Sequence, residues 1–148
     1  MVLSYEERVV NFAVMNLGCP YIWGAKGELK LFDGSIAAVK CFDCSGLVTD
    51  SIRMAGGPDL RATKNSQHLW DECGLLDEEN LPAAWLEFYG ADAYHVTHVA
   101  IFFGGWTVEA AGGDSTTLAP KPGACVMLHK GRYEGPGHLF LGRRLIPR

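Results

Sequence analysis

The residues around one cysteine have the types and spacing needed for nucleophilic chemistry. Cys44 follows Asp43, a good N-cap, and apolar or small residues then recur at the spacing of a helix buried on one face. Gly56-Gly57-Pro58 marks the end of that helix. A thiol at a helix N-terminus meets the positive end of the helix dipole, which favours the thiolate, and the unpaired N–H groups there suit an oxyanion. The alternative is a buried, unreactive cysteine, the commoner fate of this residue type.

A nucleophilic cysteine needs a base, and one β-hairpin offers it. Residues 95–103 and 106–111 alternate with period two around Gly104-Gly105, which predicts two antiparallel strands joined by a two-residue turn. If Phe103 pairs with Trp106, one face of the hairpin is wholly apolar, and we expect it to be core. That face holds Val99, Ile101, Phe103, Trp106, Val108 and Ala110.

The opposite face of the hairpin carries a base and an acid. In this register His98 and Glu109 are diagonal neighbours, about 7–8 Å apart between backbones, which an imidazole and a carboxylate can bridge. Cys44 as nucleophile, His98 as base and Glu109 as the acid that fixes the imidazole tautomer would form a thiol-peptidase triad. The alternatives are a structural strand histidine and a solvated carboxylate. We expect His95 to be structural, and no spacing marks His68, His129 or His138.

A metal or redox site is the competing interpretation of the cysteines. Cys41 and Cys44 have C-x-x-C spacing, but a zinc site needs a second ligand pair, and neither Cys73, Cys125 nor the histidines supply one. A redox motif would follow a strand in a βαβ unit, which the residues upstream do not predict. The sequence therefore predicts no metal, and the odd total of five cysteines suits reduced thiols.

The composition is that of an ordinary globular protein. The chain has 148 residues, 48% apolar and 20% charged, so we expect residues 1–148 to form a single catalytic domain. The net charge of −4 argues against nucleic acid or an anionic membrane as the main partner. No run reaches the length of a transmembrane helix, and the first residues lack the features of a secretory signal. These features predict a cytoplasmic location as synthesised.

The remaining patterns predict the elements that position the site. Ser4 and Glu7 form a capping box for a first helix that reaches Gly18. Tyr21 lies in an ordered loop and either offers its hydroxyl to a site or packs as an aromatic. Further predicted elements are a loop at 26–40 with a short strand pair or turn, helices at 65–74 and 77–89, and strands at 124–128 and 138–146. Helices followed by strands imply an α+β fold with an antiparallel sheet.

Several motifs together resemble the NlpC-type cell-wall cysteine peptidases, which are papain-like enzymes that cleave the peptide stems of peptidoglycan. They are Gly18-Cys19-Pro20-Tyr21-Ile22-Trp23-Gly24, Phe42-Asp43-Cys44-Ser45-Gly46-Leu47-Val48, Asn65-Ser66-Gln67, His98-Val99-Ala100-Ile101 and Glu109-Ala110. The resemblance implies a papain-like thiol peptidase core, with N-terminal helices packed on a C-terminal antiparallel sheet. It covers the chain from about the first helix to Ala110.

The resemblance also implies roles for individual residues. Cys44 would be the nucleophile and His98 the base. Tyr21 would help hold the oxyanion or substrate, and Asp43 and Ser45 would contact the substrate. The family typically hydrolyses the bond between D-glutamate, through its γ-carboxyl, and diaminopimelate or lysine, without a metal or organic cofactor.

The sequence departs from the family pattern in two places. The family usually has a histidine as the third polar residue, and Glu109 stands there; a carboxylate can also orient an imidazole and favour its charged form. The usual Pro-Gly-Asp-Leu before the histidine strand is replaced by Leu86-Glu87-Phe88-Tyr89-Gly90, which changes one wall of the cleft.

Three functions stay open on these observations. The first is a peptidoglycan endopeptidase that acts on the cell wall after release, injection or secretion, for example a phage lysin, a tail hydrolase or a secreted effector, or else a cytosolic enzyme that recycles wall peptides. The second is an amidase or acyltransferase that uses the same thiol fold. The third is a non-catalytic phage tail or assembly module. The partners considered are a peptidoglycan stem peptide or wall fragment and a phage tail or immunity protein.

Overall fold

A computed structural model describes residues 2–133, 135 and 137–148 of the chain. Within these residues the helices are α1 Tyr5–Val14, α2 Cys44–Met54 and α3 Ser66–Glu72. The strands are β1 Lys26–Lys30, β2 Val39–Phe42, β3 Ala84–Asp92, β4 His95–Phe103, β5 Trp106–Ala111, β6 Cys125–Lys130 and β7 Leu139–Arg144. None of the helices in this described part has the length and apolar character needed to cross a membrane.

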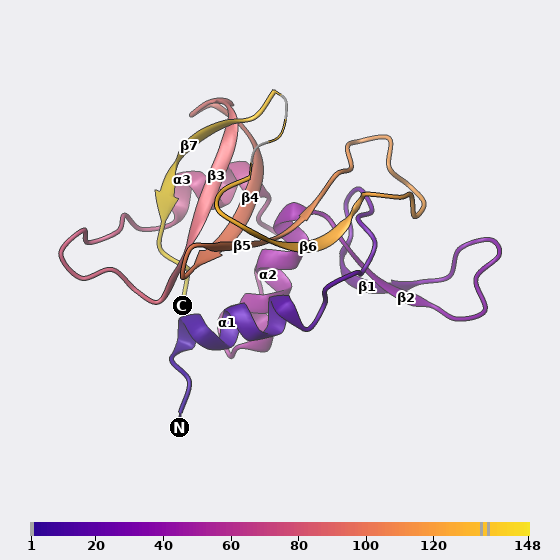
Figure 1. Cartoon of the computed structure of the whole chain (residues 1–148), viewed down its shortest axis with the longest axis horizontal. Helices are drawn as coiled ribbons and strands as arrows, with labels where there is room; N and C mark the ends of the chain where they lie inside the picture. Colours follow the sequence, from indigo (N-terminus) through magenta and orange to yellow (C-terminus); the bar gives the residue numbers. More distant parts are fainter. Residues whose placement is uncertain (1, 134, 136) are drawn as a thin grey trace.

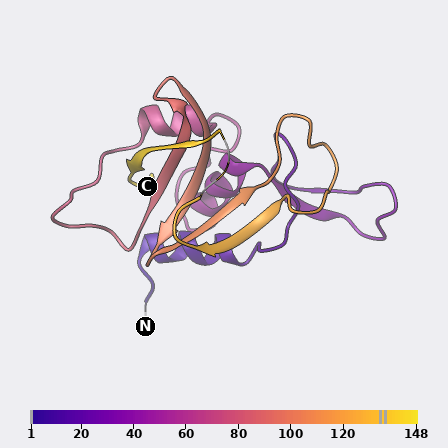
Figure 2. The ribbon, with the colours of Figure 1, turned by 45° about the horizontal axis from the view of Figure 1, so that its top comes forward.

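The centre of the fold is a five-stranded antiparallel sheet in the order β6-β5-β4-β3-β7. Helices α1 and α2 lie side by side against it, as Figures 1 and 2 show, and α3 packs on β4. The core between these layers is formed by side chains from α1, α2 and the three middle strands, including Val9, Leu47, Ile52, Phe88, Ile101 and Val108. The predicted α+β architecture is therefore confirmed.

A second, two-stranded sheet stands apart from the main one. Strands β1 and β2 pair antiparallel, and their hairpin projects on the same side as the loop between β5 and β6 (Figure 1). The ordered loop predicted at residues 18–24 joins the two sheets, because Pro20 bridges to Cys125 and Tyr21 to Phe42. This loop carries Tyr21 to the mouth of the site.

Helix α2 is the best-buried element of the chain. Its N-cap is Asp43, as predicted, and the Asp43 carboxylate accepts a hydrogen bond of 2.6 Å from the Gly46 amide. Residues Cys44 to Ile52 are all buried. The position of Cys44 is therefore fixed both by the cap and by the packing of the whole helix.

Gly46 allows this close packing. A Cβ at residue 46 would lie 2.1 Å from the Ala25 carbonyl oxygen, which is backbone and cannot rotate away. We expect Gly46→Ala to lower the free energy of unfolding by about 2–3 kcal/mol through overpacking, measured by urea denaturation. Gly74→Ala is the matched control, since its Cβ would meet only the Leu145 side chain at 3.3 Å. Equal midpoints for the two variants would contradict this account.

The β4–β5 hairpin has the predicted register, with Phe103 opposite Trp106 and Ile101 opposite Val108. The prediction that its apolar face is wholly core is wrong at the turn, where Phe103 is half-buried and Trp106 is 42% exposed. The turn extends beyond the helices that cover the rest of the face. The opposite face is also buried, and Glu109 is only 1% exposed.

The helix predicted at 77–89 is wrong, because residues 84–92 form β3 in the middle of the sheet. Both faces of β3 are covered, so the strand lacks the polar alternation that identifies a half-buried strand. Glu87 is one of the buried positions of this strand, although its side chain is charged. It is 1% exposed and accepts a 2.7 Å hydrogen bond from Arg132 Nε.

Other differences are shifts of boundaries. Helix α1 has the predicted Ser4/Glu7 capping box but ends at Val14, before the predicted Gly18. Strand β6 continues to Lys130, two residues past its predicted end. Strand β7 begins at Leu139, which leaves His138 in the segment before it. The last two shifts place His129 on β6 and His138 just before β7.

Candidate active site

The thiol of Cys44 lies at the base of a cleft of about 490 Å³. Helix α2 brings it there from one side, and β4 passes on the other, where the Thr97 carbonyl oxygen accepts from Sγ at 3.8 Å. Cys44 is 8% exposed. The first turn of α2 has backbone N–H groups without helical partners, and Asp43 takes up only that of Gly46. The thiol therefore lies beside donors that suit an oxyanion.

The structure brings the predicted base and acid into contact. His98 on β4 and Glu109 on β5 are both buried, and His98 Nε2 lies 2.5 Å from Glu109 Oε1. This contact occupies Nε2 of His98, and a hydrogen bond with Cys44 contributes to the raised pKa of the His98 ring. Cys44, His98 and Glu109 thus form a continuous chain of polar contacts, in the order that a thiol nucleophile, a base and an orienting acid require.

The contacts of His98 favour its charged form. Burial alone would lower the pKa of His98, but its hydrogen bonds to Cys44 and Glu109 outweigh burial and raise the pKa from 6.5 to about 9. An imidazolium beside the thiol favours the thiolate. The contacts therefore favour a charged His98 ring between the Cys44 side chain and the Glu109 carboxylate.

This pKa shift predicts a pH dependence of stability. Because the pKa of His98 is higher in the folded state, its contribution is fully present below about pH 6.5 and is lost as the pH rises toward about 9. We expect the difference in free energy of unfolding between the wild type and His98→Gln to shrink over that interval, measured by urea denaturation at each pH. A difference that grows with pH would contradict the assignment.

Tyr21 lies at the same cleft as Cys44. Its side chain is buried against Gly113, where any Cβ would lie 2.1 Å from the Tyr21 ring. Burial raises the pKa of Tyr21, and the neighbouring Cys44 and Asp43 raise it further, so the phenol stays protonated. Tyr21 can therefore donate a hydrogen bond to an oxyanion formed near Cys44.

Removing this hydroxyl tests that role. We expect Tyr21→Phe, which keeps the ring packing, to lower kcat by about 10- to 100-fold with little change in stability. Tyr5→Phe is the matched control, because the Tyr5 hydroxyl donates to the Pro147 carbonyl oxygen, away from the cleft. A kcat for Tyr21→Phe within twofold of the wild type would exclude the hydroxyl from the reaction.

Asp43 and Ser45 line the cleft, as expected for substrate contacts, but both also bind Lys26. Lys26 Nζ donates to both Asp43 oxygens and to Ser45 Oγ, each at 2.8 Å. Asp43 therefore caps the helix and pairs with a lysine before any substrate arrives. Substrate contact by either residue stays a prediction. Lys26 itself was not predicted, since nothing in a loop 17 residues before Asp43 marks it as a partner.

Comparison with known proteins agrees with the geometry. The model of the NlpC/P60 family matches residues 18–135. The chain belongs to the NlpC/P60 family. A search of curated protein sequences gives no match. The peptidoglycan hydrolase RipB from Mycobacterium tuberculosis has a similar fold, with 23% identity and a TM-score of 0.64, over 97% of this chain and 65% of RipB. Part of RipB therefore has no counterpart here.

Two further solved structures have a similar fold, and one of them is described as non-catalytic. RipD from Mycobacterium tuberculosis, described as a non-catalytic domain adapted to peptidoglycan binding, is 20% identical with a TM-score of 0.65, over 98% of this chain and 99% of RipD. The resuscitation promoting factor interacting protein RipA was solved with mutations at a cysteine, a histidine and a glutamate. The glutamate variant is 22% identical with a TM-score of 0.60, over 96% of this chain and 62% of RipA. At these identities the likeness shows the fold, which is papain-like.

Two histidines that no spacing marked also lie at the site of this NlpC/P60 chain. His129 Nε2 contacts Glu109 Oε2 from β6. His138 lines the cleft, and its Nδ1 lies 2.8 Å from Thr97 Oγ1. Burial lowers the pKa of His138, and the nearby His98 lowers it further, so its ring is neutral near pH 7. The sequence could have indicated His129 through the pairing of its strand with the strand of Glu109. The predicted strand ended at Leu128, so His129 was left outside it.

Tyr133 covers the ring of His98. The Tyr133 ring lies 4.8 Å from the His98 ring, centre to centre. Two contacts with β3 hold this part of the chain, one between Arg132 and Glu87 and one from the Tyr133 amide to the Tyr89 hydroxyl at 3.2 Å. Tyr133 therefore shields the His98 ring from water, which strengthens its polar contacts.

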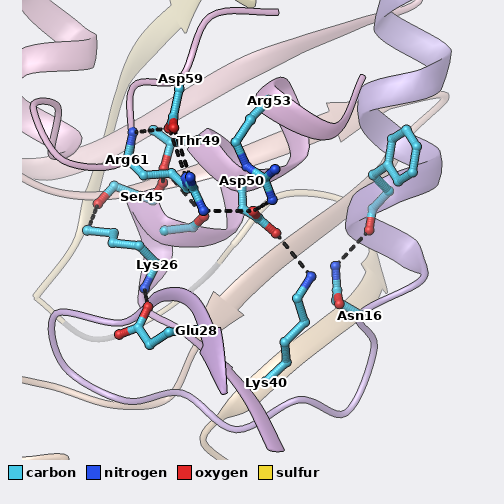
Figure 3. A network of polar contacts seen from close by, with 12 residues as sticks. Asn16, Lys26, Glu28, Lys40, Ser45, Thr49, Asp50, Arg53, Asp59 and Arg61 are labelled. Atoms are coloured by element: carbon cyan, nitrogen blue, oxygen red, sulfur yellow. Dashed lines mark hydrogen bonds and ion pairs between the residues drawn. The ribbon is translucent and has the colours of Figure 1, made fainter. Parts of the chain in front are cut away.

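A network of charges fixes the other side of α2 (Figure 3). Asp50 is 1% exposed and pairs with Arg53 at 2.8 Å and Lys40 at 3.3 Å. Lys40 belongs to β2, so this pair ties α2 to the two-stranded sheet. Gly27 on β1 makes room, since a Cβ there would lie 2.9 Å from the Asp50 carboxyl group. The network positions the helix that carries Cys44.

Cys41 and Cys44, the C-x-x-C pair, lie in different core clusters. All five cysteines are free thiols. Cys41 belongs to a small core cluster with Ile22 and Ala25, whereas Cys44 belongs to the main core. Among residues 2–133, 135 and 137–148, no group of three or more His, Cys, Asp or Glu side chains has the arrangement to hold a metal ion.

Proposed function

We propose that this chain is a cysteine peptidase that hydrolyses peptidoglycan stem peptides. The observation that carries the proposal is the chain of contacts from Cys44 through His98 to Glu109 at the base of a cleft. Membership of the NlpC/P60 family and the similar fold of a peptidoglycan hydrolase support the substrate class. RipA was mutated at the same three residue types, which agrees with this assignment.

The geometry supports a two-step acyl transfer. The Cys44 thiolate attacks the carbonyl carbon of the scissile amide, and the first-turn N–H groups of α2 with the Tyr21 hydroxyl stabilise the oxyanion. The C–N bond then breaks as His98 gives its Nδ1 proton to the leaving amine. Water attacks the thioester while His98 accepts its proton, and the thiolate leaves as the new carboxylic acid is released. Glu109 holds the imidazole throughout.

The bond proposed is the one between D-glutamate, through its γ-carboxyl, and diaminopimelate or lysine. Cleavage there places the γ-glutamyl carbonyl at Cys44 and the third residue of the stem as the leaving amine. The cleft beside Cys44 is lined by Asp43, Ser45 and Asp114, which can accept hydrogen bonds from the amide and amine groups of a peptide stem.

Digestion of purified peptidoglycan tests the proposal. Walls of the diaminopimelate and lysine types are incubated with the protein and with Cys44→Ala, and soluble fragments are identified by mass spectrometry. We expect fragments with a new amine on the third stem residue, absent with the variant. Release of whole stems from muramic acid would show that the activity is that of an amidase and not of a peptidase.

Two other outcomes reject hydrolysis of the wall. Binding to peptidoglycan without any fragments, together with an unreactive Cys44, would assign the chain to binding, as in RipD. A reactive Cys44 without fragments from either wall type would point to another acyl substrate, as in an amidase or acyltransferase.

A further inference from the structure

The carboxylate of Glu109 is shared between two histidines. His98 on β4 contacts Oε1, and His129 on β6 contacts Oε2, each through Nε2. The register explains the second contact, since Glu109 lies opposite Met127 and Thr107 opposite His129, which makes His129 a diagonal neighbour on the same face. Both oxygens of the acid are thus held by ring nitrogens from the strands on either side.

Glu109 needs both partners because it is fully buried. Its side chain has no exposed surface, while His129 is 32% exposed and His98 8%. Burial favours the protonated form of a carboxyl group unless hydrogen-bond donors compensate for lost water. With only His98 as partner, Oε2 would be an unsatisfied buried acceptor, and the carboxylate could rotate away from the imidazole.

We propose that His129 is a positioning residue: its Nε2–H holds Oε2 of Glu109, which keeps the Glu109 carboxylate aimed at His98. The proposal rests on the proposed function, since it concerns the same triad. It extends the triad by one strand, to a histidine whose other edge reaches solvent. Glu109 then fixes the His98 tautomer with Nε2–H toward the acid and Nδ1 toward the thiol.

The other titratable groups around the pair do not replace His129. Tyr89 from β3 and Tyr133 from the segment before β7 stay protonated, because burial raises the pKa of each and the charge of Glu109 adds to it. Cys44 from α2 and His138 face His98 rather than Glu109. Loss of the His129 donor therefore acts on Glu109 first and reaches the thiol through His98.

The test compares His129→Phe, which removes the donor, with His129→Gln, whose amide nitrogen can replace Nε2–H. The readout is the rate of Cys44 alkylation by iodoacetamide against pH, followed on the Cys44 peptide by mass spectrometry. For His129→Phe we expect a rate at pH 7 about tenfold lower, with the acidic limb moved up by about one pH unit. For His129→Gln we expect most of the wild-type profile to return.

The matched control is His95→Phe. His95 also contacts a carboxylate, Asp92, at 2.8 Å, but this pair is exposed and lies outside the site. We expect its alkylation profile to match the wild type. Thermal unfolding checks that each variant is folded. If His129→Phe is unfolded, the pKa of His98 is measured by ¹⁵N-imidazole titration in folded His129→Gln, where we expect the wild-type value. A lower pKa of His98 in His129→Gln overturns the proposal.

The outcomes separate this proposal from the proposed function. A folded His129→Phe with an unchanged alkylation profile overturns the role of His129, whatever happens to peptidoglycan. A shifted profile restored by glutamine supports it even if no wall fragments are released, in which case only the substrate assignment fails. An ordinary, unactivated Cys44 in the wild type overturns both.

Discussion

Replacing Cys44 by alanine is expected to lower kcat on peptidoglycan by at least about 10⁴-fold, because no other thiol is among the described residues that line the cleft. The fold should survive, since the cap of α2 rests on Asp43 and Gly46 and not on the thiol. Binding of wall material should persist, because the folded cleft is retained. The measurement is the initial rate of fragment release, with thermal unfolding to confirm the fold.

Cys73→Ala is the matched control for that experiment. Cys73 is a half-buried thiol at the end of α3, outside the cleft of Cys44, and burial raises its pKa to about 11. We expect its activity to equal that of the wild type. Residual activity above about 1% in Cys44→Ala would show that the thiol is not the nucleophile.

Changing Glu109 to glutamine should have the second largest effect, a fall in kcat of about 10³-fold with KM nearly unchanged. Glutamine keeps the shape of the side chain but has one acceptor oxygen, while two histidine N–H groups point at it. One of the two histidine N–H groups then faces the NH₂ group of the glutamine, which cannot accept a hydrogen bond. The His98 tautomer is lost or its imidazolium loses the facing charge, and both outcomes weaken the thiolate.

The pH profile distinguishes this electrostatic effect from general damage. With the negative charge gone, the pKa of His98 should fall from about 9, so the alkaline limb of kcat/KM moves to lower pH. Asp92→Asn, which changes the exposed His95–Asp92 pair, should leave kcat and both limbs unaltered. A Glu109→Gln variant with wild-type kcat would remove the acid from the triad.

Local signals in the sequence were enough to predict the parts of the site that are close in the chain. Asp43 before Cys44 and the small residues after it specify a capped helix, and the structure has that helix. Alternation around Gly104-Gly105 predicts the hairpin register, which brings His98 and Glu109 within reach of each other, and the structure shows them in contact. Both inferences use interactions between residues fewer than about fifteen positions apart.

The missed features depend on contacts across the fold. Glu87 has a polar side chain on a buried strand, and its partner Arg132 lies 45 residues away. His138 lines the cleft and contacts Thr97, which lies 41 residues before it in the chain. Lys26 pairs with Asp43 only because the two-stranded sheet folds back on α2. No periodicity in the sequence encodes such contacts, since periodicity reports only which face of an element is buried.

The most direct test of the central claim is to trap the acyl-enzyme. The wild type is mixed with a synthetic stem peptide containing the D-γ-glutamyl bond, quenched with acid within one turnover, and examined by intact-protein mass spectrometry. The account predicts an added mass equal to the peptide without its leaving amine, located on Cys44 and absent in Cys44→Ala. Cleavage of the peptide with no adduct at any quench time, or with an adduct on another residue, would contradict it.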